Sequence, residues 1–374
     1  MINTAVSQKN DFKLQDNPMI LDIENIAKSR LSPIANCIDQ EGYYPIDIMA
    51  DLGKAGAFAQ HLDFNDNRFD LALANMRAIS RECGSTGFMS WCHDVCGLYM
   101  EKSGNNSLID RVHDHAYGKT FGGTGLSNPM KAFTNIEKMA LKAKKVSDGY
   151  IVSGTLPWVS HIAKSQYCGA IAAVENKIDE TSHEVFFILD IDDQVSLTKC
   201  PQFSGMEGTS TWGIKLNDYF VSDAQIIADP ARPFIKKIRS AFILLQTGWA
   251  RGVIQASIDA CREVESSLGH VNQFLHNRPD ELEAELEDLE KRIDILARNP
   301  FDSDKEHMLN VLDTRAHCGE LSLKASQSAL LHQGARGYLM KSKPQRLIRE
   351  AHFVAIVTPA IKHLRWEMAK LMSN

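Results

Sequence analysis

The sequence predicts an α+β protein made of three parts: an N-terminal α-helical domain over residues 1–117, a middle antiparallel β-barrel or sandwich over residues 118–231, and a C-terminal four-helix bundle over residues 232–374. Apolar residues in the first and last parts recur at helical spacing. In the middle part, short β-prone runs alternate with Gly, Asn and Asp turns. The chain has 374 residues, 44% of them hydrophobic, which is enough for a large core divided among several subdomains.

The N-terminal part carries two apolar stripes with helical spacing, over residues 21–31 and 46–58. Pro33 and Pro45 stand near the predicted helix starts. Proline is tolerated there because its missing N–H would have no partner in the first turn. We therefore expect helices from about residue 20 to residue 116.

The middle part contains four clear β-prone segments, at residues 149–160, 168–174, 184–190 and 213–221. We interpret the first as a β-hairpin and expect roughly seven strands in all. The C-terminal part predicts four long helices, over residues 241–266, 281–297, 309–333 and 346–372. Four long helices in succession favour a bundle.

Composition and charge argue against several classes of protein. The formal net charge is −6 and no basic stripe is interleaved with aromatic residues, so we expect no nucleic-acid partner. No apolar run reaches the length of about 18 residues that a membrane span needs. Residues 1–10 lack the apolar core of a signal peptide, which predicts a cytoplasmic protein.

The eight cysteines are scattered and form no Cys-x-x-Cys pair, so we expect reduced thiols rather than disulfides. Cys92 and Cys96 lie one helical turn apart with His93 between them. A zinc site would need a further ligand and a better facing geometry. We therefore predict no metal site.

The most informative segment ends in Trp158, Val159 and Ser160. These adjacent residues offer an indole face, a backbone amide and a hydroxyl. Together they suit a flat ring with polar edges, such as a flavin. The alternative for the same pattern is an ordinary half-buried strand, and the surrounding sequence decides between the two.

Five segments, in order along the chain, resemble the acyl-CoA dehydrogenase superfamily from about residue 20 to the end. They are Leu31–Pro45 with Leu52–Gly56, Leu126–Pro129, Gly154–Ser160, Gly205–Thr211, and Gly334–Tyr338 with Arg346–Ala351. The resemblance implies the acyl-CoA dehydrogenase fold, a homotetramer, and a bound FAD, or alternatively FMN, between the β domain and the bundle.

The resemblance also implies which residues contact the flavin ring. Leu126 and Ser127 would contact its pyrimidine edge, and Trp158 would lie against it. Val159 would bind the cofactor with its backbone amide, and Ser160 would reach N5. A flavin needs such donors to hold charge in its reduced form, and a protein supplies them preorganised.

The chain departs from the superfamily where the catalytic base is expected. Dehydrogenation of an acyl thioester needs a carboxylate to take the α-proton. The position that matches the usual Glu is Thr358, and the second known base position is Ile238. Neither can act as that base at neutral pH. Glu350 is the nearest acid, but it matches a structural acid of the superfamily that pairs with an arginine.

The nucleotide-binding motifs also differ. The arginine that the resemblance expects near a neighbour's FAD pyrophosphate is replaced by Glu265, a carboxylate that repels phosphate. Arg336 and His270 are the substitute cations that the sequence offers, and we predict Arg336 as a cofactor-binding residue.

The segment Gly84–His93 resembles the two-component flavin monooxygenase branch of the superfamily. In that branch a histidine on this helix supports oxygen activation, so the resemblance implies catalytic roles for His93 and for Asn128, which replaces the superfamily's Glu. The alternative for His93 is a structural helix histidine. We interpret the other histidines near motifs as structural: His161, His332 and His352.

Three hypotheses remain open from the sequence. The first is a flavin-dependent monooxygenase or oxidase acting on a small apolar or aromatic substrate, with a flavin reductase as partner. The second is an acyl-CoA dehydrogenase with a relocated base, which passes electrons to an electron-transfer flavoprotein. The third is a non-catalytic flavin-binding or assembly protein that keeps the fold.

Overall fold

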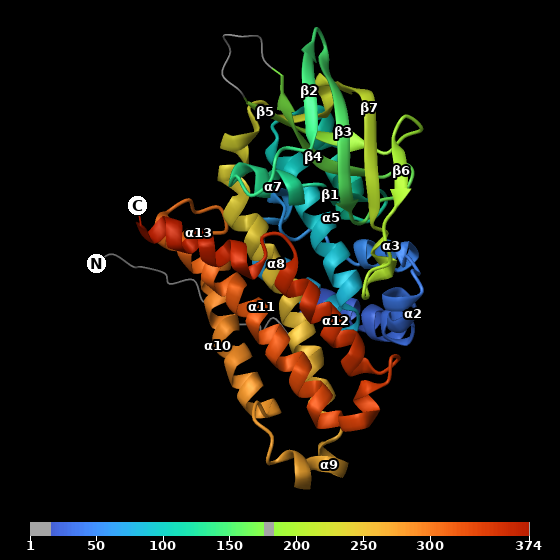
Figure 1. Ribbon diagram of the computed structural model, residues 1–374, viewed down its shortest axis with the longest axis vertical. Helices are drawn as coiled ribbons and strands as arrows, with labels where there is room; N and C mark the ends of the chain where they lie inside the picture. Colours follow the sequence, from blue (N-terminus) through green and yellow to red (C-terminus); the bar gives the residue numbers. More distant parts are fainter. Residues whose placement is uncertain (1–15, 176–182, 374) are drawn as a thin grey trace, which may run out of the picture.

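The computed structural model describes residues 16–175 and 183–373 (Figure 1). Its N-terminal part is helical, as predicted. The Asn17 side chain caps the first helix by accepting a hydrogen bond from the Met19 amide at 3.0 Å. The six α-helices of this part are α1 (Pro18–Ile26), α2 (Ala35–Gln40), α3 (Ile46–Lys54), α4 (Phe69–Glu82), α5 (Gly84–Lys102) and α6 (Asn106–Ala116).

The middle part forms one sheet with the strand order β6-β7-β3-β2-β4-β5-β8, and β1 pairs with β4. The β2–β3, β3–β7, β4–β5, β5–β8 and β6–β7 pairs are antiparallel, as expected, whereas the β2–β4 and β1–β4 pairs are parallel. A short helix, α7 (Ser127–Phe133), follows β1. The strands are β1 (Gly122–Thr124), β2 (Leu141–Val146), β3 (Gly149–Val159), β4 (Tyr167–Val174), β5 (Glu184–Asp190), β6 (Ser196–Lys199), β7 (Trp212–Ser222) and β8 (Ile226–Ala228).

Strand β3 corrects the prediction of a hairpin within residues 149–160. This segment is a single strand, and the hairpin is the antiparallel pair that β3 forms with β2. The register between β3 and β7 shifts between Leu156 and Val159, where Pro157 has no N–H to donate. Such an irregularity re-aims side chains, and Trp158 beside it is 59% exposed.

The C-terminal part is a helical bundle, as predicted, with one correction. The segment predicted as one helix over residues 346–372 is interrupted at 357–360, because the residue before Pro359 is disfavoured in helical conformation. The helices are α8 (Ala231–Arg262), α9 (Glu265–Asn272), α10 (Pro279–Ala297), α11 (Lys305–Gln333), α12 (Lys343–Ile356) and α13 (Ile361–Ser373).

Helix α5 joins the parts of the molecule. Every residue from Gly84 to Met100 is buried, so this helix has no solvent-exposed face along that length. Figure 1 shows it passing from the sheet toward the bundle. Its close approach to α4 depends on Gly87, where an added Cβ would lie 2.2 Å from the Ser80 Cβ. This packing fixes which side chains of α5 can face the space between sheet and bundle.

Helix α6 ends at Ala116 and α8 begins at Ala231, next to the boundaries predicted after residues 117 and 231. The division into three independent domains stays a prediction. Among the described residues, no helix combines the length and the apolar character that crossing a membrane requires.

Candidate functional site

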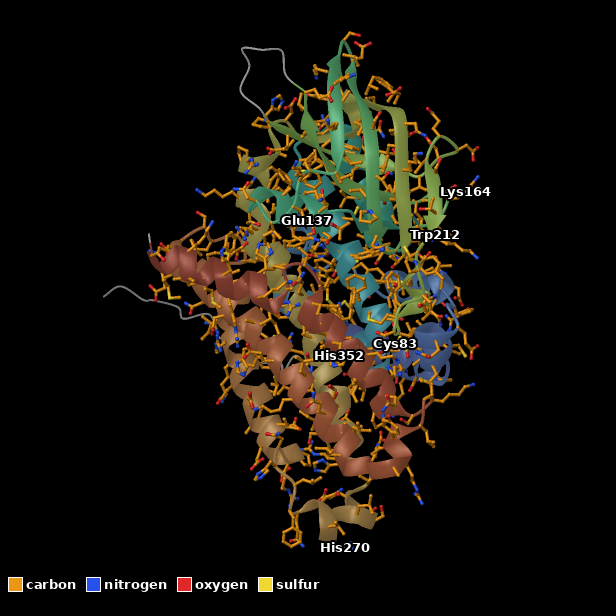
Figure 2. All side chains as sticks on the ribbon, in the orientation of Figure 1. Cys83, Glu137, Lys164, Trp212, His270 and His352 are labelled. Carbon is orange, nitrogen blue, oxygen red and sulfur yellow. The ribbon has the colours of Figure 1, made fainter. Side chains whose placement is uncertain are left out.

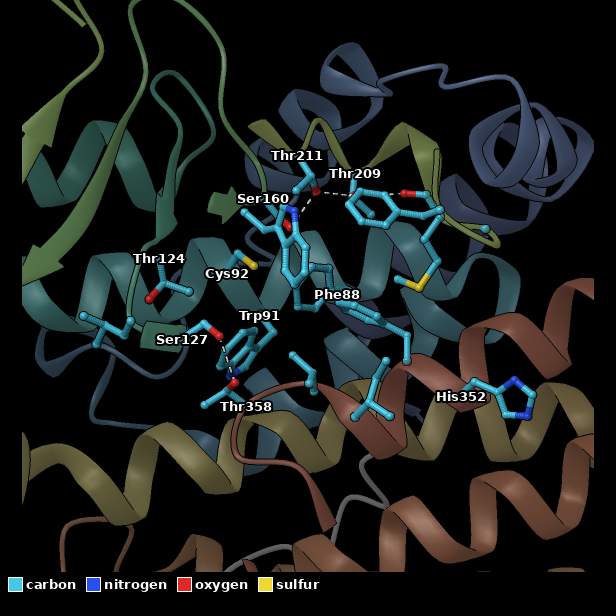
Figure 3. Close-up of a pocket in the computed structure, with 18 of the residues that line it drawn as sticks. Phe88, Trp91, Cys92, Thr124, Ser127, Ser160, Thr209, Thr211, His352 and Thr358 are labelled. Atoms are coloured by element: carbon cyan, nitrogen blue, oxygen red, sulfur yellow. Dashed lines mark hydrogen bonds between the residues drawn. The ribbon is translucent and has the colours of Figure 1, made fainter. Parts of the chain in front are cut away.

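The main cavity has a volume of about 450 Å³ and lies where the sheet, α5 and α12 meet (Figure 3). Four of the six predicted flavin contacts line it. These are Leu126, Ser127, Trp158 and Ser160. The other lining residues are Phe88, Trp91, Cys92, Thr124, Lys131, Phe203, Ser204, Gly205, Met206, Thr209, Thr211, Phe242, Arg349, His352, Phe353, Ile356, Val357 and Thr358.

One side of the cavity is formed by the end of β3 and the start of β7. Trp158 meets Phe203 edge-on, with ring centroids 6.2 Å apart. The Ser160 and Thr211 hydroxyls are 2.7 Å apart, and Thr211 is 2.9 Å from the Thr209 hydroxyl (Figure 3). An exposed indole and a run of three hydroxyls therefore lie at one edge of the cavity.

A second polar pair lies at the start of α7. The Ser127 hydroxyl is 2.9 Å from the Thr358 hydroxyl, which comes from the interruption between α12 and α13 (Figure 3). Leu126, the residue before α7, is buried and lines the same wall. The predicted contact Val159 does not line the cavity, because its side chain packs into the sheet core.

Aromatic rings from three helices form the inner wall. Phe88 stacks on Trp91 at 5.8 Å between centroids, and Trp91 meets Phe242 of α8 edge-on at 5.2 Å. Phe353 of α12 closes this wall, 4.8 Å from Phe88. The Trp91 indole donates to the Phe242 carbonyl at 3.3 Å, so its polar atom is satisfied. The wall is apolar and rigid, which suits an apolar or aromatic ligand.

The titratable groups that line the cavity are basic or thiol. The Lys131 ammonium pairs with Glu137 at 2.6 Å, and Arg349 pairs with the buried Asp39 at 2.5 Å. His352 lines the cavity from an exposed position on α12. Burial raises the pKa of Cys92 well above its usual value, so its thiol is protonated. Within the described ranges 16–175 and 183–373, no Asp or Glu lines the cavity.

Glu350, the nearest acid, and Ile238, the second base position, do not line the cavity. Glu350 is fully buried, accepts from the Gly84 amide at 3.0 Å and pairs with Arg346 at 2.8 Å. Burial raises the pKa of its carboxyl despite the arginine. Ile238 is buried and does not line the cavity. Glu350 is therefore placed as a structural acid, as its sequence position indicated.

His93 does not line the cavity, and the catalytic role expected for it stays a prediction. Phe88, Trp91 and Cys92 present one face of α5 to the cavity, and the next position points about 100° away. The His93 Nε2 bonds to the His115 carbonyl at 2.9 Å, and the His115 Nε2 bonds to the His93 carbonyl at 2.8 Å. Burial lowers the pKa of His93 to about 3, so its ring is neutral at neutral pH.

Asn128 also has no place in the cavity. Its amide nitrogen donates to the Lys138 carbonyl at 2.9 Å, and its amide oxygen accepts from the Ala140 amide at 2.9 Å. These bonds hold the loop between α7 and β2. The catalytic role expected for Asn128 stays a prediction.

The residues predicted near the nucleotide lie outside the cavity. Arg336 is exposed in the turn after α11, and Figure 2 shows His270 at the far end of the bundle. Glu265 pairs with Arg278 at 3.0 Å. Arg336 therefore does not contribute to this cavity, and a role toward another copy of the chain stays a prediction.

The sequence missed several cavity residues. Thr209 and Thr211 lie within the segment Gly205–Thr211 and could have been found from their hydroxyls. His352, interpreted as structural, lines the cavity, whereas His161 and His332 are buried. Arg349 could not have been found, because its position depends on Asp39, 310 residues away.

The order of elements and the cavity at their junction define the class of protein: the chain has the acyl-CoA dehydrogenase fold. The resemblance that the sequence indicated is thereby confirmed. Butyryl-CoA dehydrogenase from Megasphaera elsdenii superimposes with a TM-score of 0.81, at 14% identity, over 96% of this chain and 99% of that chain. The dibenzothiophene monooxygenase TdsC from Paenibacillus sp. A11-2 superimposes with a TM-score of 0.78, at 13% identity, over 95% and 97%.

Comparison of sequences gives the particular relatives. The chain is 21% identical over 357 residues to the probable acyl-CoA dehydrogenase YngJ of Bacillus subtilis, covering 89% of this chain and 91% of that protein. It is 19% identical over 381 residues to benzylmalonyl-CoA dehydrogenase of Aromatoleum aromaticum, covering 97% and 100%. No family model matches the chain.

Proposed function

We propose that the cavity binds the isoalloxazine ring of FAD or FMN and that the protein is a flavin-dependent oxidoreductase. One observation carries this proposal: Trp158 and the hydroxyls of Ser127, Ser160 and Thr211 gather on one cavity that has no carboxylate among its described lining residues. When bound, a flavin supplies the transfer of electrons or hydride that none of these side chains can perform.

The residues fit such a ring. The Trp158 residue is 59% exposed and meets the Phe203 ring edge-on, which leaves indole surface available to a planar ligand. The Ser160 hydroxyl can turn its proton toward the cavity because Thr211 can take over as donor between them. An FMN-bound structure of TdsC, which shares this fold with a TM-score of 0.80, supports the assignment.

For the reaction, we propose oxidation by molecular oxygen of a small apolar or aromatic substrate, as a monooxygenase or oxidase. The cavity has aromatic walls but no carboxylate to take a proton from carbon among the residues described. Its residues would orient the substrate against Phe88 and Trp91 and exclude water. A flavin reductase would be the partner, and the monooxygenase TdsC among the fold neighbours supports this choice.

The alternative is an acyl-CoA dehydrogenase with a relocated base and an electron-transfer flavoprotein as partner. Its support is the curated relatives, which include YngJ and benzylmalonyl-CoA dehydrogenase. In this alternative His352 is the group that would accept the proton, because it lines the cavity and a neutral imidazole can act as a base. The non-catalytic hypothesis keeps the cavity but assigns it no reaction.

A flavin titration tests the proposal. We expect the purified protein to be yellow, or to turn yellow with added FAD or FMN. Under anaerobic conditions, acyl-CoA thioesters should not bleach the bound flavin, whereas oxygen should reoxidise the reduced, flavin-loaded protein rapidly. Anaerobic bleaching that His352→Gln abolishes would instead select the dehydrogenase. A protein that binds neither flavin contradicts both enzymatic assignments.

We also propose that the protein is a homo-oligomer, a tetramer. Large apolar side chains are exposed around α9 and the turn after α11, including Phe274 at 81%, Tyr338 at 76% and Leu339 at 65%. Such a cluster favours a protein–protein contact. Light scattering after gel filtration should give about four times the 41.7 kDa of one chain. Phe274→Asp should lower that mass, and a wild-type monomer would contradict the proposal.

A further inference from the structure

The interruption between α12 and α13 leaves several backbone carbonyls without helical hydrogen bonds, and those of Val354 and Thr358 are two of them. Helix α12 ends at Ile356, and Val357 turns the chain to an extended conformation with ψ of 146°. The carbonyl of Val354 therefore loses the partner that a continuing helix would supply, and the carbonyl of Thr358 lies within the interruption itself. Buried carbonyls without partners are costly, so donors must come from elsewhere.

Two buried side chains of the bundle supply those donors. Arg315 of α11 donates from Nη2 to the Val354 carbonyl at 2.5 Å and from Nε to the Gln246 amide oxygen at 2.6 Å. Gln246 of α8 donates from its amide nitrogen to the Thr358 carbonyl at 3.0 Å. Thr358 in turn meets Ser127, so a continuous chain of hydrogen bonds runs from the bundle core to the cavity.

The guanidinium group of Arg315 lies in the interior of the bundle. The side chain is fully buried, and in ranges 16–175 and 183–373 no carboxylate forms an ion pair with it. Burial lowers the pKa of Arg315 to about 10, which leaves the guanidinium charged at neutral pH. Its contact with a carbonyl in the last turn of α12 places it at the negative end of that helix dipole, which stabilises a cation.

We propose that Arg315 and Gln246 are positioning residues of the cavity, which hold the segment 357–360 so that Thr358 faces Ser127. Neither side chain lines the cavity. Gln246 acts through the Thr358 carbonyl inside the segment, and Arg315 acts through the Val354 carbonyl at the end of α12 and through the Gln246 side chain. Any effect of these two residues on flavin binding rests on the proposed function, whereas their effect on the position of residues 357–360 does not.

Hydrogen exchange of the flavin-free protein tests the positioning directly. Gln246→Glu keeps an acceptor for Arg315 but, as a carboxylate beside a guanidinium, loses the donor to Thr358. We expect exchange in the peptide over residues 355–362 to rise about 10-fold, because a buried hydrogen bond that opposes local opening is lost. Peptides of α8 and α11 should not change, which separates positioning from general destabilisation.

A matched control is Arg251→Met, which removes another nearly buried arginine of the bundle that lies on α8 and approaches Glu290 instead. It should lower the thermal midpoint without faster exchange at 355–362. Arg315→Lys, which keeps one donor, should give a smaller rise than Arg315→Met.

For flavin binding, Gln246→Glu should raise the dissociation constant about 10-fold. Unchanged exchange at 355–362 in Gln246→Glu, or equal changes in the control, overturns the positioning role. A wild-type protein that binds no flavin overturns the proposed function, and the exchange result still decides the positioning role.

Discussion

Replacing Trp158 with alanine should weaken flavin binding by about 10- to 100-fold and leave the thermal midpoint almost unchanged. Stacking of a planar ring on an aromatic side chain contributes about 1–3 kcal/mol, which corresponds to that range. The indole is 59% exposed and its aromatic neighbour Phe203 is 6.2 Å away, so the protein itself gains little from it. Titration of the variant with FAD and FMN, followed by visible absorption, measures the effect.

Two variants make this prediction specific. Trp158→Phe keeps an aromatic face and should lose less affinity than the alanine variant. Tyr43→Ala removes an aromatic side chain of similar exposure, 46%, that does not line the cavity, and should leave flavin affinity unchanged. Equal affinity of wild type and Trp158→Ala would show that the ring does not lie against the indole.

Acidification should destabilise the protein through four buried histidines: His61, His93, His115 and His161. Burial lowers the pKa of His61 to about 4 and of His93 to about 3, and it lowers the pKa of His115 and His161 well below the usual value. Burial keeps these rings neutral, although the hydrogen bonds that His61, His93 and His115 make to backbone carbonyls act in the opposite direction and raise the pKa. His93 and His115 each use Nε2 toward the other's backbone carbonyl, and the His115 Nδ1 is 2.8 Å from the Tyr167 hydroxyl.

The sign follows from which state binds the proton. In the unfolded chain each histidine protonates near pH 6.5, whereas the folded protein resists protonation until a lower pH. Their contribution to stability is therefore complete above pH 6.5 and is lost as the pH falls toward the folded pKa. At pH 5 the loss is about 2 kcal/mol for each histidine. Burial raises the pKa of Asp94 and Glu350, so these two carboxyls oppose the loss.

Comparison of variants isolates the histidine contribution. His61→Gln can keep a donor toward the Asp94 carbonyl, which His61 Nε2 meets at 2.8 Å, but cannot titrate. Urea unfolding between pH 7.5 and 5 should show about 2 kcal/mol less loss of stability in this variant than in wild type. His113→Gln, at a histidine whose side chain is 70% exposed, should follow the wild-type curve. Parallel curves for all three proteins would contradict the prediction.

Local sequence patterns were enough for the elements that depend on nearby residues. Helical spacing of apolar residues located α8, α10 and α11, and β-prone runs located β3, β4, β5 and β7. These patterns are local, because the repeat of side-chain directions along a helix or a strand depends only on the backbone of that element. The Trp158–Ser160 segment was found for the same reason, since its three groups are adjacent in the chain. The last predicted helix, over residues 346–372, runs across Pro359, and the chain breaks there into α12 and α13.

By itself, the sequence therefore determined the order of helices, sheet and bundle, the resemblance in fold, and the replacement of the usual base by Thr358. Only the tertiary structure decided that His93 faces away from the cavity, that Glu350 is held by Arg346 and the start of α5, and that His352 lines the cavity. The physical reason is that spacing along a helix says which residues share a face. Which face meets the cavity is set by packing among elements far apart in the chain, as between Asp39 and Arg349.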